Sequence, residues 1–262
     1  MPTPTPAILV LGASSGFGEA TVRAFAAAGY DIFGVHLDRA AGLAHVAEIV
    51  AAVEAHGRRA RFFNVNAADA EKRAEVVDQL RLEIPAGGLA VLLHSLAFGT
   101  LKPLVTDDEK EALNQRQLEM TLDVMANSLV YWTQDLVRAG LLGRGGRIYA
   151  MTSAGDRIIW KAYGAVSAAK CALESHIRQL AVELAPAGIT ANAIKAGVTD
   201  TPALRKIPGN AEIIESALAR NPSGRLTTPE DVARCLVALA APGTQWLTGN
   251  VIQVDGGEDV AG

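Results

Sequence analysis

A serine, a tyrosine and a lysine with acid–base potential lie in the second half of the chain, at Ser153, Tyr163 and Lys170. A free phenol has a pKa of about 10, which is too high for ready proton exchange at neutral pH. A neighbouring ammonium stabilises the phenolate and lowers that value, so we expect Lys170 to lower the pKa of Tyr163. Seven helical residues turn through about 700° and rise about 10 Å, which returns Tyr163 and Lys170 to nearly the same helix face. The spacing therefore predicts that both side chains face one ligand, although a packing role for Tyr163 is the alternative.

A glycine-rich segment near the N-terminus could bind a phosphate. It reads Gly12-Ala-Ser-Ser-Gly16-Phe-Gly18 and lies between an apolar run and an Ala-rich helical segment. Phosphates are held by backbone N–H groups at a helix N-terminus, and glycines allow the close approach and the tight turn that such binding needs. The predicted pyrophosphate-binding residues are Gly12, Ser14, Ser15, Gly16, Phe17 and Gly18. A glycine cluster can also be a plain turn, and the strand–turn–helix context is what favours a dinucleotide here.

The elements that must position these residues alternate between apolar runs and amphipathic segments. Strands are expected at 8–11, 32–37, 60–65, 89–93, 147–151, 190–194 and 251–254. Helices are expected at 21–28, 40–56, 70–84, 163–184 and 229–239, and one long or broken helix is expected at 107–139. Alternation of this kind predicts α/β class, with a mostly parallel seven-stranded sheet covered on both faces. We expect one doubly wound Rossmann-type domain over residues 1–262, with an extended tail at 1–6 and a substrate lid at 196–228.

Composition excludes several classes of function. The chain has 262 residues, a net charge of −4 and no block of like charges, so neither nucleic acid nor an anionic membrane is expected as a partner. No apolar run approaches the roughly 18 residues of a membrane span, and a cytoplasmic location is expected. The histidines and the two cysteines, Cys171 and Cys235, show no metal-ligand spacing, so no metal is expected. Both cysteines are predicted to be reduced and buried in packing.

The chain resembles the short-chain dehydrogenase/reductase family over nearly its whole length. The resemblance is carried by the G-x-x-x-G-x-G spacing, the Tyr/Lys pair, Pro222-Ser-Gly-Arg225 and Val254-Asp-Gly-Gly257. The resemblance implies a hydride-transfer enzyme that uses NAD(H) or NADP(H) and assembles as a homodimer or homotetramer. It implies that Ser153 hydrogen-bonds the substrate oxygen or the phenol. It also implies that Tyr163 shares a proton with the substrate oxygen and that Lys170 holds the nicotinamide ribose hydroxyls while tuning the phenol.

Finer features resemble enoyl-acyl-carrier-protein reductases. Most family members have Tyr-x3-Lys, whereas this chain has Tyr-x6-Lys and carries Val166 where an ordinary member has its tyrosine. The segment from His94 to Phe98 and Ala196 in place of a proline are also similar to enoyl reductases. An ordinary glycine turn and a serine at position 153 depart from the main enoyl-reductase type. The mixture is most similar to the third bacterial type, and Ser153 would equally serve a carbonyl reductase.

The second predicted strand ends in a segment that could select the nucleotide. His36 stands at the usual position of the acid that accepts ribose hydroxyls, with Asp38 and Arg39 following. Asp38 would repel a 2′-phosphate and Arg39 would attract one, and the resemblance of the Leu37–Arg39 stretch to an NADH-dependent enoyl reductase favours NADH slightly. Arg39 could equally lie in a solvated loop. Asn64 and Val65 are expected to flank the adenine.

The remaining expected dinucleotide contacts are implied by the family resemblance. They come from the ends of the fourth, fifth and sixth predicted strands and from the lid: Ser95, Leu96, Ala97, Thr152, Lys170, Gly197, Val198, Thr199 and Thr201. Thr199 and Thr201 would bond the carboxamide and the pyrophosphate. An apolar wall suited to an acyl chain is expected from Leu204, Ile207, Ile213 and Ile214, whose aliphatic side chains could alternatively be ordinary packing.

The leading hypothesis is reduction of an enoyl thioester, small or carried on an acyl carrier, with hydride delivered to the β-carbon and Tyr163 stabilising the enolate oxygen. The first alternative is a 3-oxoacyl or other carbonyl reductase of the same family, in which Tyr163 protonates the carbonyl oxygen directly. The second alternative is a regulator that binds a dinucleotide without turnover, against which the intact Ser153, Tyr163 and Lys170 argue. The sequence leaves acyl length, carrier and pathway open.

Overall fold

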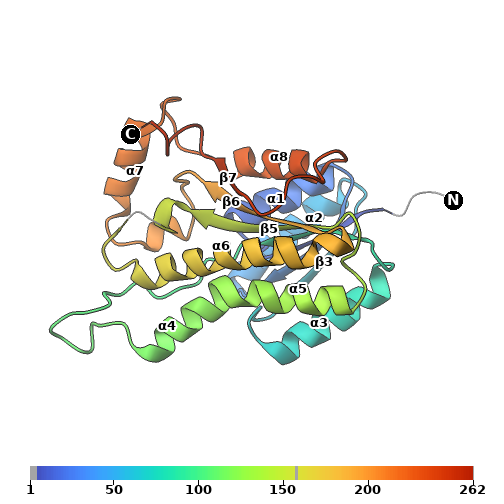
Figure 1. Ribbon diagram of the computed structural model, residues 1–262, viewed down its shortest axis with the longest axis horizontal. Coiled ribbons are helices and arrows are strands. Elements are labelled where there is room, and N and C mark those ends of the chain that lie inside the picture. Colours follow the sequence, from blue (N-terminus) through green and yellow to red (C-terminus); the bar gives the residue numbers. More distant parts are fainter. Residues whose placement is uncertain (1–4, 157–158, 262) are drawn as a thin grey trace.

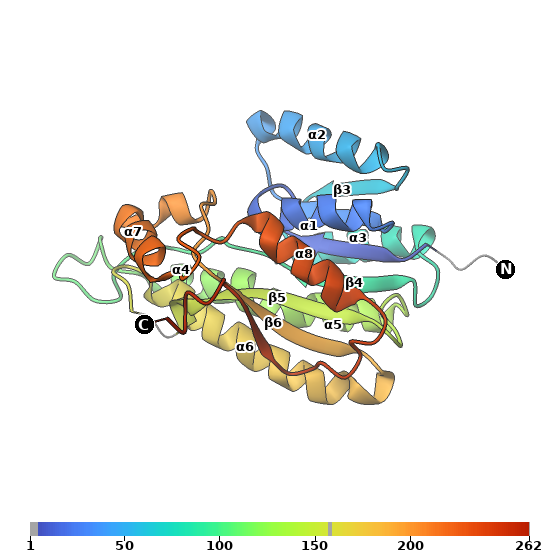
Figure 2. The same cartoon turned by 90° about the horizontal axis from the view of Figure 1, so that it is seen from above.

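The computed structural model describes residues 5–156 and 159–261. Seven parallel strands form one sheet in the order β3-β2-β1-β4-β5-β6-β7. Figures 1 and 2 show the domain from two directions. The strands are β1 (Ala7–Leu11), β2 (Asp31–His36), β3 (Ala60–Asn64), β4 (Leu89–His94), β5 (Arg147–Ser153), β6 (Thr190–Ala196) and β7 (Val251–Val254). The predicted Rossmann-type α/β domain with a seven-stranded sheet is confirmed, and every strand pair in it is parallel.

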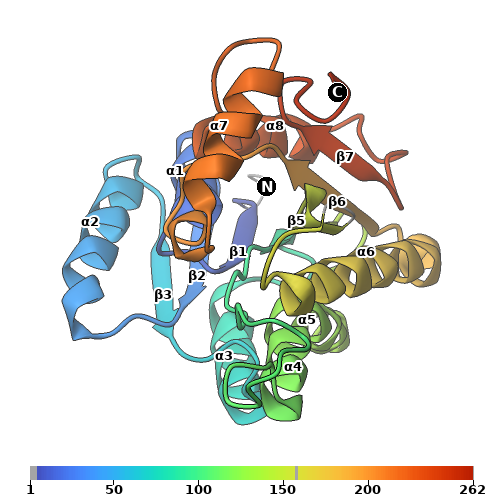
Figure 3. The same ribbon diagram turned by 90° about the vertical axis from the view of Figure 1, so that its left-hand side faces the viewer.

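Helices cover both faces of this sheet, as the end-on view in Figure 3 shows. They are α1 (Gly16–Ala27), α2 (Leu43–Glu54), α3 (Ala70–Glu83), α4 (Gln115–Leu122), α5 (Ser128–Arg138), α6 (Gly164–Leu184), α7 (Asn210–Arg220) and α8 (Pro229–Ala240). Helices α1, α2 and α8 enclose one apolar core, and α3, α5 and α6 enclose the other. Because both faces are covered, the central strand β1 is apolar along its whole length, and all five of its residues are buried.

The chain reverses its direction of strand addition between β1 and β4, which are neighbours in the sheet. In open parallel sheets a ligand crevice forms at the carboxyl ends of the strands beside such a switch point. Here the glycine turn follows β1, Ser95 follows β4, and Ser153 ends β5. The topology therefore brings the candidate catalytic and binding residues together at the carboxyl ends of β1, β4 and β5.

The helix predicted at 107–139, as either long or broken, begins later than expected, and the structure has the broken form. Residues 107–114 form turns, and α4 begins only after Asn114, whose side chain accepts from the Gln117 backbone while Gln117 bonds back. A π-helical segment, Asp123–Asn127, then separates α4 from α5. The Asn-x-x-Gln capping box was the sequence signal for the true start, and π-helical turns have no such signal.

The lid predicted at 196–228 contains more regular structure than expected. It holds a 3-10 turn at Leu204–Lys206 and helix α7. The apolar residues of α7, namely Ile213, Ile214, Ala217 and Leu218, do recur at helical spacing, but the glycines and prolines on both sides of the helix favoured a loop. The predicted burial of the cysteines is also wrong, because Cys171 is exposed and Cys235 is half-buried, and both are free.

Four features bear on the remaining expectations. No helix among the described residues is long and apolar enough to cross a membrane. The described part of the chain contains no cluster of three or more metal-ligating side chains. Residues 1–4 of the predicted tail lie outside the described residues. Leu129 and Trp132 of α5 are fully buried in this chain's own core, and the homodimer or homotetramer that the family resemblance implies stays a prediction.

Candidate active site

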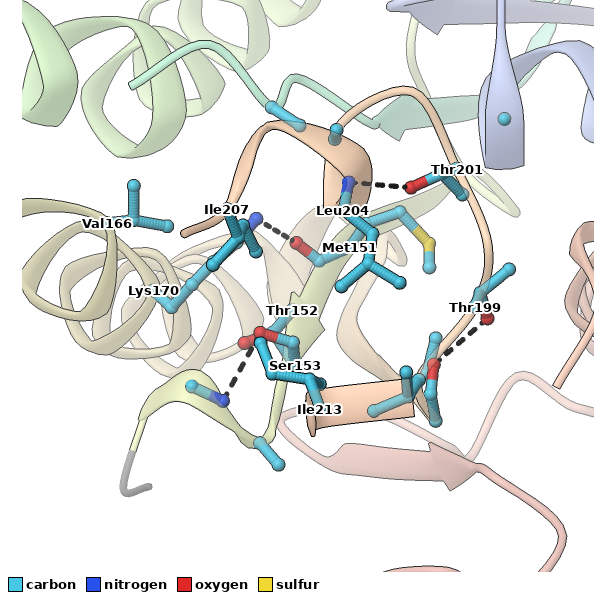
Figure 4. Close-up of a pocket in the computed structure, with 18 of the residues that line it drawn as sticks. Met151, Thr152, Ser153, Val166, Lys170, Thr199, Thr201, Leu204, Ile207 and Ile213 are labelled. Carbon is cyan, nitrogen blue, oxygen red and sulfur yellow. Dashed lines mark hydrogen bonds between the residues drawn. The ribbon is translucent and has the colours of Figure 1, made fainter. Parts of the chain in front are cut away.

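Ser153, Tyr163 and Lys170 line one pocket of about 380 Å³. Ser153 is the last residue of β5, Tyr163 immediately precedes α6, and Lys170 lies two turns into that helix. The Ser153 hydroxyl bonds the Tyr163 phenol and accepts from the backbone N–H of Gly155 at 3.3 Å. Figure 4 shows Ser153 and Lys170 at the pocket wall. The structure thus brings together the three residues that the spacing singled out.

The electrostatics of Tyr163 differ from expectation. Burial raises the pKa of Tyr163, and the hydrogen bond with Ser153 only partly opposes that rise. The predicted lowering by Lys170 is wrong for this structure, because desolvation of the phenolate outweighs every favourable contact. Tyr163 is therefore a neutral phenol at physiological pH, which suits it to donate a hydrogen bond or a proton to a substrate oxygen.

Lys170 is an unusually enclosed lysine, with a residue exposure of 6%. Burial lowers its pKa to about 8, against an opposing effect of the Glu174 carboxylate one turn further along α6. Its ammonium donates to the Met151 carbonyl at 2.8 Å, a bond drawn in Figure 4. The next residue of β5, Thr152, donates from its hydroxyl to Glu174 at 2.7 Å.

His94, at the end of β4, is buried close to this group. Its Nε2 lies 2.9 Å from the Ser128 hydroxyl, and its Nδ1 has no hydrogen-bond partner among the described residues. Burial, together with the charge of Lys170, lowers the pKa of His94 to about 3. The imidazole is consequently neutral at any pH at which the protein would be assayed, and it contributes no charge to the site.

The glycine turn forms a backbone cradle beside the pocket. A Cβ on Gly18 would overlap the Gly12 carbonyl, and a Cβ on Gly12, whose φ is +90°, would overlap the Ser95 carbonyl. Ser15 stands at the N-cap of α1 without a side-chain cap bond, so the first N–H groups of the helix remain available for an anion. Ser15, Gly16 and Phe17 line the pocket, whereas Gly12, Ser14 and Gly18 build the turn behind it.

The segment after β2 presents a carboxylate to the same turn. Asp38 contacts Nδ1 of buried His36 at 2.9 Å, and its backbone is fixed by two hydrogen bonds to the Asn64 side chain. Burial raises the pKa of Asp38, but hydrogen bonds from Ser14 and His36 outweigh it and hold that pKa below its usual value. Arg39 is exposed. Asn64 and Val65, at the end of β3, lie next to this segment and outside the pocket lining.

The other predicted contact residues also meet at the pocket. Those that line it are Ser95, Leu96, Ala97, Thr152, Gly197, Val198, Thr199 and Thr201. Thr199 donates to the Gly197 carbonyl at 3.0 Å, and Thr201 accepts from the Leu204 backbone at 3.2 Å. Of the expected apolar wall, Leu204, Ile207 and Ile213 line the pocket and Ile214 does not.

Sequence reasoning missed three features of the site. Glu174 is buried beneath Lys170, and the i,i+4 spacing of the pair was the available signal. Lys195, in the pocket lining, bonds Asp156 at 2.8 Å, a contact between distant segments without a local signal. Trp160 lines the pocket and donates from its indole to the Pro208 carbonyl at 2.8 Å, which joins the segment before Tyr163 to the lid.

Comparison with known proteins places this geometry in a family. The family described as Enoyl-(Acyl carrier protein) reductase matches residues 12–258. The NADH-dependent enoyl-[acyl-carrier-protein] reductase FabI of Aquifex aeolicus is 32% identical over 69% of this chain and 66% of that protein. The 3-oxoacyl-[acyl-carrier-protein] reductase FabG of Aggregatibacter actinomycetemcomitans is 31% identical over 95% of this chain and 98% of that protein.

Solved structures agree on the architecture. The crystal structure of the Aquifex aeolicus enoyl reductase superposes with a TM-score of 0.84 and 24% identity, covering 97% of this chain and 96% of that one. A short-chain dehydrogenase from Burkholderia cenocepacia in complex with NADP has a TM-score of 0.82 and 28% identity, over 97% and 98%.

The fold is of Rossmann type, and the family match identifies the chain as an oxidoreductase. The chain belongs to the short-chain dehydrogenase/reductase family. Its relatives span enoyl reductases, oxoacyl reductases and other dehydrogenases, so family membership by itself leaves the substrate open.

Proposed function

We propose that the protein reduces enoyl thioesters at the expense of a nicotinamide dinucleotide. One observation carries the proposal, namely the seven-residue spacing of Tyr163 and Lys170 on α6. Val166, where the closer-spaced tyrosine of ordinary members would stand, lines the pocket, and Tyr163 is the single tyrosine among the described lining residues. The reacting phenol is therefore almost a full helical turn away from the position used for direct carbonyl reduction.

The residues fit a dinucleotide. Gly12 and Gly18 of the cradle leave no room for a Cβ, the N-terminal end of α1 has no side-chain cap, and the pocket continues from there to Ser153 and Tyr163. When bound, the dinucleotide supplies the hydride. Ser15, Gly16 and Phe17 would hold the pyrophosphate, Thr199 the carboxamide, and Lys170 the ribose hydroxyls.

Charge development on the substrate explains the role of the phenol. As the β-carbon of the enoyl thioester accepts hydride, the electron pair of the double bond moves through the α-carbon onto the thioester oxygen. The neutral Tyr163 phenol donates a hydrogen bond to that oxygen, and Ser153 orients the phenol. A proton then adds to the α-carbon and restores the thioester carbonyl, so one hydride and one proton are taken up.

The pocket wall suits an acyl chain. The lining includes apolar side chains from four regions of the chain: Leu101, Met125, Val166, and the lid residues Leu204, Ile207 and Ile213. Burial of methylene groups against such a wall contributes about 0.8 kcal/mol each. The wall therefore favours a hydrocarbon thioester over a small polar substrate.

NADH is the proposed nucleotide. The Asp38 carboxylate is held on Ser14 of the glycine turn and on His36, in the region where an adenosine ribose would lie. An ionised carboxylate accepts hydrogen bonds from ribose hydroxyls and repels a 2′-phosphate. The relative from Aquifex aeolicus is named as an NADH enzyme, which agrees with this choice.

A 3-oxoacyl or other carbonyl reductase is the second candidate. It is favoured by the bond between Ser153 and Tyr163, because a serine beside the phenol suits direct protonation of a carbonyl oxygen. The relatives with oxoacyl reductase and hydroxycyclohexanecarboxylate dehydrogenase activities support it.

The test of the proposal compares wild type with Tyr163→Phe in NADH oxidation by crotonyl and longer enoyl thioesters. We expect turnover by wild type and a fall of about 10²-fold or more in kcat for the variant, because the enolate oxygen loses its donor. Tyr131→Phe is the matched control, since Tyr131 stacks on Arg73 between α3 and α5 and lies outside the pocket. Wild type that binds NADH yet reduces no thioester would favour the regulator, and equal activity of the two variants would remove Tyr163 from the mechanism.

A further inference from the structure

The two residues of β5 that precede Ser153 each form a hydrogen bond with a residue of α6. The Met151 carbonyl accepts from the Lys170 ammonium at 2.8 Å, and the Thr152 hydroxyl donates to the Glu174 carboxylate at 2.7 Å. We call these four residues the β5–α6 clasp. Lys170 and Glu174 are one helical turn apart, so they occupy the same face of α6.

The clasp buries a carboxylate that packing alone does not explain. Thr152, Lys170 and Glu174 have exposures of 4%, 6% and 8%. An ionised carboxylate loses several kcal/mol of hydration on burial unless hydrogen bonds and an opposite charge replace it. An apolar residue of similar volume would fill this position at lower cost. We therefore ask what the negative charge at position 174 does, and the group on which it acts is Lys170, whose pKa it raises against the effect of burial.

We propose that Glu174 is a positioning residue, which holds Thr152 and hence Ser153 in register with Tyr163 and whose negative charge stabilises the Lys170 ammonium. The proposal rests on the proposed function only in assigning Lys170 to the dinucleotide. It applies equally to enoyl and to carbonyl reduction, because both need a charged lysine and a fixed serine.

The other titratable groups around Lys170 do not replace Glu174. His94 from β4 is neutral, since its pKa is about 3, and Tyr163 at the start of α6 is a neutral phenol. Lys195 from β6 is itself a cation and bonds Asp156. Among the described residues, Glu174 is the one anionic group whose charge opposes the burial of Lys170.

Three variants separate the charge of Glu174 from its hydrogen bond. Glu174→Gln keeps an acceptor for Thr152 and removes the charge. Thr152→Val keeps the charge and removes the bond at nearly constant volume. Glu183→Gln is the matched control, because Glu183 is exposed near the far end of the same helix.

The first readout is NADH affinity from pH 6.5 to 10, measured by the change in nucleotide fluorescence, which requires no substrate. Wild type should lose affinity as pH rises through the Lys170 pKa of about 8. Glu174→Gln should move this loss to lower pH by about half a unit or more, because the ammonium has lost its counter-charge. Thr152→Val and Glu183→Gln should leave its position unchanged.

The second readout is the pH profile of kcat/KM with whichever thioester is turned over. Glu174→Gln should shift the alkaline limb in the same direction as the affinity, and Thr152→Val should lower kcat by about 10-fold at every pH. A purely structural Glu174 would instead lower activity evenly, without moving either curve. That result, or an unshifted affinity curve, would overturn the proposal.

Folding of the variants is checked by thermal melts before either readout. Should Glu174→Gln not fold, the decision passes to Glu174→Asp, which keeps the charge on a shorter side chain. This variant should retain the wild-type pH midpoint of NADH affinity while lowering kcat, and a displaced midpoint would contradict the charge role. The affinity readout also separates this proposal from the proposed function, because NADH binding is measurable even if no thioester is reduced.

Discussion

Burial of the Lys170 ammonium lowers the stability of the fold but places a charged group in the candidate active site. An ammonium enclosed by α6 and β5 is disfavoured by desolvation, and its bond to the Met151 carbonyl and the charge of Glu174 offset only part of that cost. The same enclosure keeps the group within reach of a dinucleotide and of Tyr163. Residues that weaken the fold at a functional site in this way are expected where charge is needed in a buried pocket.

The buried lysine predicts a pH-dependent stability. The pKa of Lys170 is depressed to about 8 from 10.5, so between these values the unfolded chain binds more protons than the folded one. Unfolding free energy should therefore rise with pH across this window by up to about 1.4 kcal/mol per unit from this group alone. Urea titrations of wild type and Lys170→Met at pH 7 and pH 10 test this. The stability of wild type relative to the variant should be greater at pH 10, and a constant difference would contradict the assignment.

Asp38 predicts the nucleotide preference. Asp38→Ala should lower the ratio of kcat/KM for NADH to that for NADPH by about 10-fold or more, because it removes both an acceptor for ribose hydroxyls and a charge that repels the 2′-phosphate. Asp31→Ala is the control, since Asp31 begins β2 at the opposite end of the strand. A wild type that prefers NADPH would show that exposed Arg39, not Asp38, governs selection.

At the scale of elements, the helices and strands that could be predicted from the sequence are those marked by a local pattern of residues. The strands and most helices followed from periodicity, and the glycine turn and the Tyr163–Lys170 spacing located the pocket. Helix α7 was missed because Pro208-Gly209 before it and Pro222 after it favoured a loop over the helical spacing of its few apolar residues. The Lys195–Asp156 bond and the clasp are contacts between segments far apart in the sequence, which no local pattern records. The raised pKa of Tyr163 was missed for a similar reason, since the extent of burial depends on the assembled pocket.

Trp160 connects the loop before Tyr163 to the lid. Its indole donates to the Pro208 carbonyl, and a Cβ on Gly209 would lie 3.1 Å from its ring, so the lid before α7 is tied to the loop before Tyr163. Trp160→Phe removes the bond and keeps a ring. Hydrogen exchange in residues 204–220 should become about 5- to 10-fold faster, as the loss of about 1 kcal/mol of a hydrogen bond implies.

Trp246→Phe is the control for the lid experiment, because Trp246 is 97% exposed and lies outside the pocket lining. Exchange in the lid should be the same in this variant as in wild type. Unchanged exchange in Trp160→Phe would mean that the indole bond does not restrain the lid.

At the scale of the whole molecule, the parallel sheet places residues from nearly every part of the chain around one pocket. The turn after β1, the ends of β4, β5 and β6, the start of α6 and the lid all contribute lining residues. The family to which the chain belongs includes relatives with different substrates, so the fold alone does not select one. Two features of this chain bear on the choice among those substrates, namely the seven-residue spacing of Tyr163 and Lys170 and the apolar side chains of the pocket wall.

The most direct measurement of that distinction is a side-by-side assay of absorbance at 340 nm with crotonyl and acetoacetyl thioesters, using NADH and NADPH separately. If the protein reduces enoyl thioesters with NADH, absorbance falls with the enoyl substrate and NADH, and the oxoacyl substrate is not reduced. Loss of absorbance with the oxoacyl substrate alone would contradict it, and would show that the Ser153–Tyr163 pair was the better guide to the reaction than the Tyr163–Lys170 spacing.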